Sequence, residues 1–168
     1  MEIGFGVFLS LQLQPLHAGF PKMNVDVSLR IRAPLDDAES ENVWEYSRDT
    51  CRRRGAHGAD KQWKFDAVLP PDSTQEQVYQ AKGKQLVDKA LLGYNTSLLA
   101  YGQSGSGKTY SMTGRPGTLG GITPRVIDDL FNRISSADTD ETTTYLVRVS
   151  FLELHADSIN DLVCGYKS

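Results

Sequence analysis

A glycine-rich segment at residues 102–109 has the residue types and the spacing of a phosphate-binding loop. It reads GQSGSGKT and fits the pattern G-x-x-x-x-G-K-[ST]. Glycines allow tight turns there and let backbone N–H groups approach phosphate oxygens closely. The lysine supplies a positive charge for the β- and γ-phosphates, and the threonine hydroxyl is a ligand type for Mg²⁺. The pattern predicts a nucleoside triphosphate site, with a purely structural glycine turn as the alternative. The predicted site residues are Gly102, Gln103, Ser104, Gly105, Ser106, Gly107, Lys108 and Thr109, and Thr109 is the predicted metal ligand.

The elements around this loop have the order that a phosphate-binding loop requires. An apolar run at 96–101 predicts a strand directly before it. Upstream, Ser73 and Glu76 have the spacing of a capping box for a helix that Gly93 ends. Downstream, Pro124 suits the first turn of a second amphipathic helix. The residues expected to be buried are Val78, Tyr79, Leu86, Val87, Ala90 and Leu91 in the first helix, and Val126, Ile127, Leu130, Phe131 and Ile134 in the second.

Further strands are indicated by alternation of apolar and other residues and by short apolar runs. The polar residues 36–62 predict a hairpin excursion or a loop, in which Arg52–Arg54 is either a solvated run or a patch for phosphate or an acidic partner. The segment 157–163, DSINDLV, predicts the start of a helix. The expected strands lie at 24–32, which we expect to be half-buried, at 63–69 and at 145–151.

Composition limits the class of protein. The chain has 168 residues, 39% of them hydrophobic, and a net charge of −3, which gives no general attraction to nucleic acid or anionic membranes. Cys51 and Cys164 are far apart and lack metal-ligand spacing, which argues against a disulfide scaffold or a zinc site and fits a reducing cytosol. The scattered histidines, His17, His57 and His155, are a weak basis for metal binding.

The N-terminal segment carries an apolar run from Ile3 to Leu13. The run is shorter than the ~20 residues of a membrane span. Glu2 stands where a secretory signal has positive charge, so a signal peptide is only the alternative interpretation. We expect residues 1–22 to be a poorly structured extension, with Met23 as a possible natural start, and residues 23–168 to form part of one domain.

The flanks of the glycine-rich loop resemble the kinesin motor domain. Residues 65–114 follow its patterns F-D-x-V-F, Q-x-x-V-Y and G-Y-N-x-x-x-x-A-Y-G-Q-T-x-S-G-K-T-[HY]-T-M nearly position by position, with Leu69 and Ser104 as departures. GITPRVIDDLF and VRVSFLELHADSINDLV are similar to the elements that follow in that family. The resemblance covers about 24–163. It implies an α/β fold of the P-loop NTPase, kinesin-motor type, with a mixed central sheet flanked by helices, here incomplete.

The resemblance also implies roles for residues outside the loop. In the family's R-x-R-P segment the first arginine and the proline border adenine, which points to Arg30 and, across one extra residue, to Pro34. Tyr110 occupies the aromatic position that stacks on the base, which implies ATP rather than GTP. The alternatives are a solvated strand face for Arg30 and a packed helix residue for Tyr110. Glu153 is a structural acid by this resemblance and a Walker-B-type acid otherwise.

A microtubule motor is the function that the resemblance implies. It would couple Mg-ATP hydrolysis to movement along microtubules, with tubulin as partner, in the cytoplasm and cytoskeleton, with no nucleic acid, no membrane span and a possible dimer formed through regions absent here. The family's switch sequences N-x-x-S-S-R-S-H and D-L-A-G-S-E do not occur in the chain, so no complete catalytic set is expected. We expect an incomplete motor domain with an unpaired sheet edge, open apolar surface and at most weak Mg-ATP binding. The alternatives are a truncated, non-catalytic protein that binds nucleotide or a partner, and another P-loop ATPase or GTPase.

Overall fold

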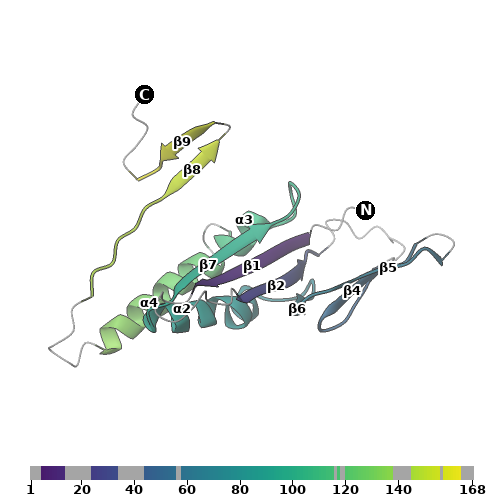
Figure 1. Ribbon diagram of the computed structural model, residues 1–168, viewed down its shortest axis with the longest axis horizontal. Coiled ribbons are helices and arrows are strands. Elements are labelled where there is room, and N and C mark those ends of the chain that lie inside the picture. Colours follow the sequence, from purple (N-terminus) through teal and green to yellow (C-terminus); the bar gives the residue numbers. More distant parts are fainter. Residues whose placement is uncertain are drawn as a thin grey trace. The chain divides into compact units, whose positions relative to one another are not determined.

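The computed structural model of the chain contains two compact units, residues 1–132 and residues 133–168. Figure 1 traces both units along the chain. The structure describes residues 5–13, 24–33, 44–55, 58–115, 117, 120–137, 145–155 and 157–163.

A four-stranded mixed sheet lies at the centre of the first unit, in the order β6-β2-β1-β7 (Figure 1). Strand β2 (Asn24–Ile31) is parallel to β6 (Ala67–Leu69) and antiparallel to β1 (Phe5–Leu13). On its other side β1 is antiparallel to β7 (Asn95–Tyr101), the strand that leads into the glycine-rich loop. The strands expected at 24–32 and 96–101 are thereby confirmed.

Strand β1 departs from the expectation that residues 1–22 form a poorly structured extension. Phe5 lies opposite Ile31 of β2, and Val7 lies opposite Tyr101 of β7, so both edges of β1 are paired. Buried backbone N–H and C=O groups need hydrogen-bond partners, and a strand with two neighbours satisfies both edges. The apolar run suits such a position. One of its partners, β7, is distant in the sequence, so local pattern alone does not reveal that β1 is paired on both edges.

The second half of strand β2, residues 28–31, is buried on both faces rather than on one. Leu29 and Ile31 pack with Cys51 and Val68 in one core cluster. On the opposite face the side chain of Arg30 is also buried, with 8% of its surface exposed. The alternation along residues 24–32 therefore predicted a strand correctly. The expectation that this strand is only half-buried is wrong at residues 28–31, because neighbouring elements cover its polar face too.

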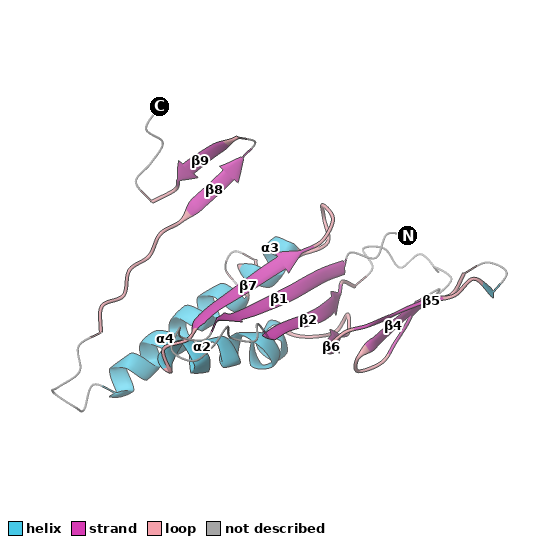
Figure 2. Cartoon of the chain, in the orientation of Figure 1, coloured by secondary structure: helices cyan, strands magenta, loops and turns pink. Residues whose placement is uncertain are grey.

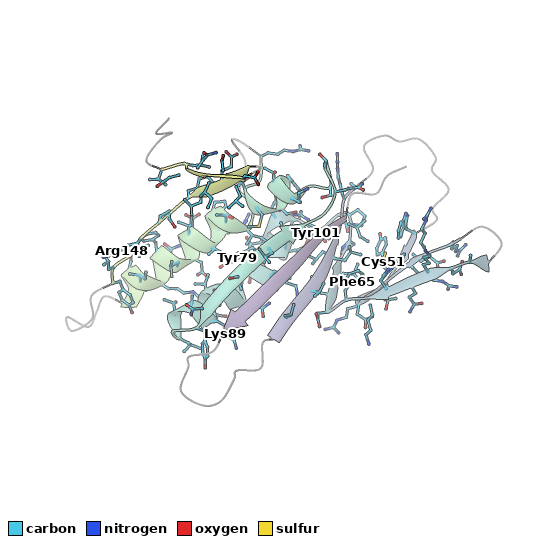
Figure 3. The ribbon with its side chains drawn as sticks, turned by 45° about the horizontal axis from the view of Figure 1, so that its top comes forward. Cys51, Phe65, Tyr79, Lys89, Tyr101 and Arg148 are labelled. Carbon is cyan, nitrogen blue, oxygen red and sulfur yellow. The ribbon has the colours of Figure 1, made fainter. Side chains whose placement is uncertain are left out.

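A second, three-stranded antiparallel sheet follows, in the order β3 (Trp44–Tyr46), β4 (Thr50–Arg53) and β5 (Lys61–Lys64). It confirms the predicted hairpin excursion within 36–62. The single strand expected at 63–69 is instead split between β5 and β6. The amide of Phe65 donates to the Asp49 carbonyl over 2.8 Å, which turns the chain out of β5. Phe65 packs against the cluster that contains Cys51, and Figure 3 labels both side chains.

The helices pack next to the four-stranded sheet (Figure 2). Helix α1 (Gln75–Val78), π-helix η2 (Tyr79–Gly83) and α2 (Lys84–Leu91) form one continuous helical stretch. The capping box lies one residue later than predicted: Gln77 N donates to Thr74 Oγ1 over 3.2 Å, and Thr74 N donates to Gln77 Oε1 over 2.8 Å. Ser73 is not the cap because its amide donates to Pro70 O in the preceding turn.

No helix among the described residues is long and apolar enough to cross a membrane.

Burial of the helical stripes is confirmed only in part. Val78, Tyr79, Leu86 and Val87 are buried, as expected, whereas Ala90 and Leu91 are exposed. In α4 (Ile122–Ala137), Ile127 and Phe131 are about half exposed, and Val126, Leu130 and Ile134 are half-buried. An open apolar groove of about 240 Å³ runs between α2, β7 and α4. This matches the expected open apolar surface. The lining residues include Leu86, Val87, Leu98, Met112, Val126 and Leu130.

The second unit contains the β-hairpin of β8 (Leu152–His155) and β9 (Ser158–Asp161), with His155 opposite Ser158. Two predictions for this region are wrong. Residues 145–150 alternate like a strand but have no regular structure, and Val149 is 79% exposed. Residues 158–161 form a strand and not a helix. Pairing with β8 decides the second case, and the first segment has no partner strand within the described part of the chain.

Removal of residues 1–22 tests the role of β1. The shortened chain would lose the backbone hydrogen bonds of β1 to both β2 and β7. At a net contribution of about 1 kcal/mol per hydrogen bond, this loss is comparable with a typical folding free energy of roughly 5–15 kcal/mol. We expect the shortened chain to lose its cooperative thermal transition, as followed by circular dichroism. Removal of residues 1–4 alone leaves β1 in place and serves as the control. An unchanged transition in the chain without residues 1–22 would contradict the central position of β1.

Candidate functional site

The glycine-rich loop connects β7 to helix α3 (Lys108–Met112), as the sequence predicted. Gly105 and Gly107 have φ angles of +76° and +96°, in the left-handed region that favours glycine. A Cβ at Gly107 would meet nothing within 4 Å, so backbone conformation, not crowding, requires glycine there. The amide of Ser106 donates to the Gln103 carbonyl over 3.2 Å and closes the loop on itself.

Three side chains of the loop have the properties that an anionic ligand with a cation would use. Lys108 Nζ donates to the carbonyls of Gly102 at 2.8 Å and of Gln103 at 2.7 Å, which holds its charge against the loop. Ser106 Oγ is buried and makes no hydrogen bond with the described residues. Thr109 is exposed, and its backbone carbonyl accepts from Thr113 Oγ1 over 2.9 Å. Lys108 supplies a positive charge and Thr109 an exposed hydroxyl, which fit a triphosphate with Mg²⁺. Ser106 fits as well, because a buried hydroxyl without a hydrogen-bond partner is costly and a phosphate oxygen would supply one.

The end of β2 is tied to the loop by an arginine that the sequence analysis did not single out. The guanidinium of Arg32 donates to the carbonyl of Gly105. Arg32 and Arg30 are two residues apart and therefore lie on the same face of the chain. That spacing, Arg-x-Arg at the end of a strand, was the available signal. Pro34, the other residue taken from this segment, lies outside the described residues.

Arg30 is a buried cation with neutral hydrogen-bond partners. One terminal nitrogen donates to Gln75 Oε1 and to Ser111 Oγ, both at 2.9 Å, and the other donates to the Ser73 carbonyl at 3.3 Å. Burial lowers the pKa of the Arg30 guanidinium, and the neighbouring Tyr110 side chain acts in the opposite direction. The interpretation of Arg30 as part of a solvated face is therefore wrong.

Tyr110 belongs to α3, directly after the loop, and its ring lies near this buried arginine. The Arg30 guanidinium carbon is 5.1 Å from the centre of the Tyr110 ring, and that of Arg115 is 5.6 Å from it. The side chain of Gln75 donates through Nε2 to the Tyr110 carbonyl over 2.6 Å. The ring is 42% exposed, so it is not a packed interior residue, and an exposed ring is able to stack on a planar base.

Helix α3 is held in place by close backbone contact with the segment that begins α4. A Cβ built on Gly121 would lie 2.5 Å from the Ser111 carbonyl oxygen and 2.6 Å from the Met112 carbonyl oxygen. Ile122, which is 1% exposed, packs in a core cluster against Met112. A glycine is therefore required at 121 for the loop and its helix to keep their position.

Other candidate residues of the sequence lie elsewhere or outside the described part. Glu153 lies in β8 of the second unit, where Asn160 Nδ2 donates to its Oε2 over 3.4 Å. Among the described residues no group of three or more His, Cys, Asp or Glu could hold a metal ion. His17, His57 and Cys164 lie outside them.

Two of the three arginines at 52–54 pair with acidic neighbours. Arg52 pairs with Asp60 and lies 3.9 Å from Glu45, and Arg54 also pairs with Glu45. The pKa of Asp60 is lowered, first by the hydrogen bond from the Gly55 amide and then by Arg52. These pairs are exposed, and exposed ion pairs contribute little to stability.

Substitution of Gly121 by alanine tests the close contact between α3 and α4. The added Cβ would collide with two backbone carbonyls, and overpacking of this kind costs about 2–3 kcal/mol. We expect a correspondingly lower free energy of unfolding, as measured by urea titration. Gly93→Ala is the matched control. Gly93 has φ +87° and open space around it, so alanine there adds only backbone strain of about 1 kcal/mol. Equal losses at the two positions would show that crowding at 121 is absent.

Comparison with known proteins gives consistent matches. A family model described as the kinesin motor domain matches residues 30–167. Over 108 residues the chain is 46% identical to kinesin heavy chain isoform 5C of Rattus norvegicus. This matched segment covers 63% of this chain and 11% of that protein. Over 146 residues it is 39% identical to the kinesin heavy chain of Caenorhabditis elegans, and this matched segment covers 83% of this chain and 17% of that protein. The chain thus spans 11% and 17% of the length of these two relatives.

Proposed function

Because the chain belongs to the kinesin motor domain family, we propose that it forms the ATP-binding part of a microtubule-based motor. In such a motor, Mg-ATP hydrolysis is coupled to movement along microtubules, with tubulin as the partner and the cytoskeleton of the cytoplasm as the location. The observation that carries the proposal is the glycine-rich loop, which stands between β7 and α3 in the part of the chain that matches the family. Dimer formation would use regions outside this chain.

In this proposal, different residues in and around the loop bind the phosphates, the Mg²⁺ ion and the base of the nucleotide. Backbone N–H groups of residues 102–109 and the ammonium of Lys108 would hold the phosphates, and Thr109 would ligate Mg²⁺. The ring of Tyr110 and the guanidinium of Arg30 would contact the base. When bound, Mg²⁺ neutralises phosphate charge that builds up during phosphoryl transfer. Lys108 would exchange two carbonyl acceptors of the loop for phosphate oxygens, which are better partners because they are charged.

A non-catalytic, nucleotide- or partner-binding protein is the second candidate function. Hydrolysis requires groups that sense the γ-phosphate and position the attacking water. The two switch sequences that the kinesin resemblance assigns to these tasks do not occur in the 168 residues. The chain by itself would then bind Mg-ATP weakly without turning it over.

Substitution of Lys108 by alanine tests nucleotide binding. Loss of a charged hydrogen bond is worth about 1.5–3 kcal/mol, or roughly a ten- to hundredfold loss of affinity for Mg-ATP. Equilibrium dialysis with labelled Mg-ATP measures it. Lys84→Ala serves as the control, because Lys84 is an exposed lysine in α2 whose side chain has no partner among the described residues. Equal affinity of the Lys108→Ala chain and the unsubstituted chain would contradict the proposed role of the loop.

Phosphate release in the presence of microtubules separates the two candidate functions for this chain. We expect the purified 168-residue chain to show no microtubule-stimulated release, because its sequence contains neither switch. A coupled phosphate assay with and without polymerised tubulin makes the measurement. Stimulated release would show that the chain contains a complete catalytic set and would remove the second candidate.

A further inference from the structure

Gln75 joins the two residues that the proposed function assigns to the base. Its Oε1 accepts from the Arg30 guanidinium at 2.9 Å, and its Nε2 donates to the Tyr110 carbonyl at 2.6 Å. Arg30 belongs to β2 and Tyr110 to α3, and Gln75 is the first residue of α1. One side-chain amide therefore links three elements that are far apart in the sequence.

Both hydrogen bonds require an amide in one orientation. A guanidinium only donates, so it needs the carbonyl oxygen of Gln75, and a backbone carbonyl only accepts, so it needs the NH₂ group. A carboxylate at this position could serve Arg30 but would repel the Tyr110 carbonyl. An alanine would serve neither partner. The chemistry of this contact is thus specific to glutamine among residues of its size.

Arg30 depends on this contact more than an exposed arginine would. It is 8% exposed, and the acceptors of its hydrogen bonds on Gln75, Ser111 and Ser73 are neutral. A buried charge is costly unless its hydrogen bonds are satisfied. Loss of the Gln75 oxygen would remove one of these three acceptors and weaken the hold on the guanidinium, whose carbon lies 5.1 Å from the centre of the Tyr110 ring.

We propose that Gln75 is a positioning residue for base recognition: it holds the Arg30 guanidinium and the Tyr110 backbone together so that they favour a nucleoside triphosphate over a bare triphosphate. The proposal rests on the proposed function. Gln75 would not touch the phosphates, which belong to the loop at 102–109. Its effect is therefore confined to the part of affinity that the base and sugar contribute.

The ratio of two affinities tests this role in the full chain. Mg-ATP and Mg-tripolyphosphate are titrated by calorimetry into the unsubstituted chain and into Gln75→Ala, Gln75→Glu and Gln80→Ala. We expect Gln75→Ala to weaken Mg-ATP about tenfold and to leave Mg-tripolyphosphate within about twofold, which lowers the ratio of affinities. Gln75→Glu keeps the size of the side chain and an acceptor for Arg30, and it should lower the ratio by a smaller factor. Gln80 is an exposed glutamine of η2 whose amide donates to Glu76, so its replacement should leave the ratio unchanged.

Each outcome decides between the roles. An equal loss for both ligands in Gln75→Ala would show a general structural effect and overturn the proposal, as would affinities equal to those of the unsubstituted chain. Should Gln75→Ala fail to fold in a thermal scan, the Gln75→Glu ratio decides alone. Binding of both ligands by the unsubstituted chain with an unchanged ratio in the variants overturns only the role of Gln75. Absence of binding by the unsubstituted chain overturns the proposed function and this role together.

Discussion

The pairing of β1 with both β2 and β7 is the contact on which the rest of the first unit depends. It holds β2 and β7 one strand apart, with Phe8 opposite Ser28 on one side and Ala100 on the other. At that separation the arginines at the end of β2 reach the loop and the helix that follow β7. Arg32 then contacts Gly105, and Arg30 contacts Ser111. Without β1, strands β2 and β7 would no longer be held at the separation that these contacts require.

Burial of charge on the polar face of β2 is the second constraint. Lys82 of η2, whose side chain is 5% exposed, donates to Asp26 Oδ1 over 2.6 Å and ties the helical stretch to the strand. Arg30 is buried on the same face, and its hydrogen-bond partners on Gln75, Ser111 and Ser73 are neutral. Loss of one partner from a buried charge pair is strongly destabilising, because the remaining charge is left without compensation. The helices are thus positioned over the sheet by polar contacts as well as by the apolar cluster of Leu69, Val78 and Ile122.

The apolar groove along α2, β7 and α4 shows that the first unit does not bury all of its apolar stripes. Ile127 of α4, which lines the groove, is 48% exposed, and Phe131 of the same helix is 47% exposed. Contiguous apolar surface of this kind promotes association or awaits a partner. Thr96 and Leu98 of β7 line the groove, so anything that covers it would contact the strand that leads into the candidate nucleotide loop.

Local features were predictable because they depend on neighbours in the sequence. The glycine-rich loop follows from its own pattern, and its left-handed glycines follow from backbone conformation. Gly93 ends its helix for the same local reason. The capping box was found but placed at Ser73 instead of Thr74, because the preceding turn uses the Ser73 amide. These features need no knowledge of distant parts of the chain.

Strand partners and buried polar contacts were decided by tertiary structure. Residues 5–13 become a strand because β2 and β7 satisfy both of their edges, whereas 145–150 stay irregular without such a partner among the described residues. The same holds for 158–161, which pair with β8 and do not form a helix. By itself the sequence determined the position of the glycine-rich loop between a strand and a helix, and it indicated the family. Only the tertiary structure decided that Arg30, Gln75 and Tyr110 meet, because hydrogen bonds between residues so far apart depend on the packing of whole elements.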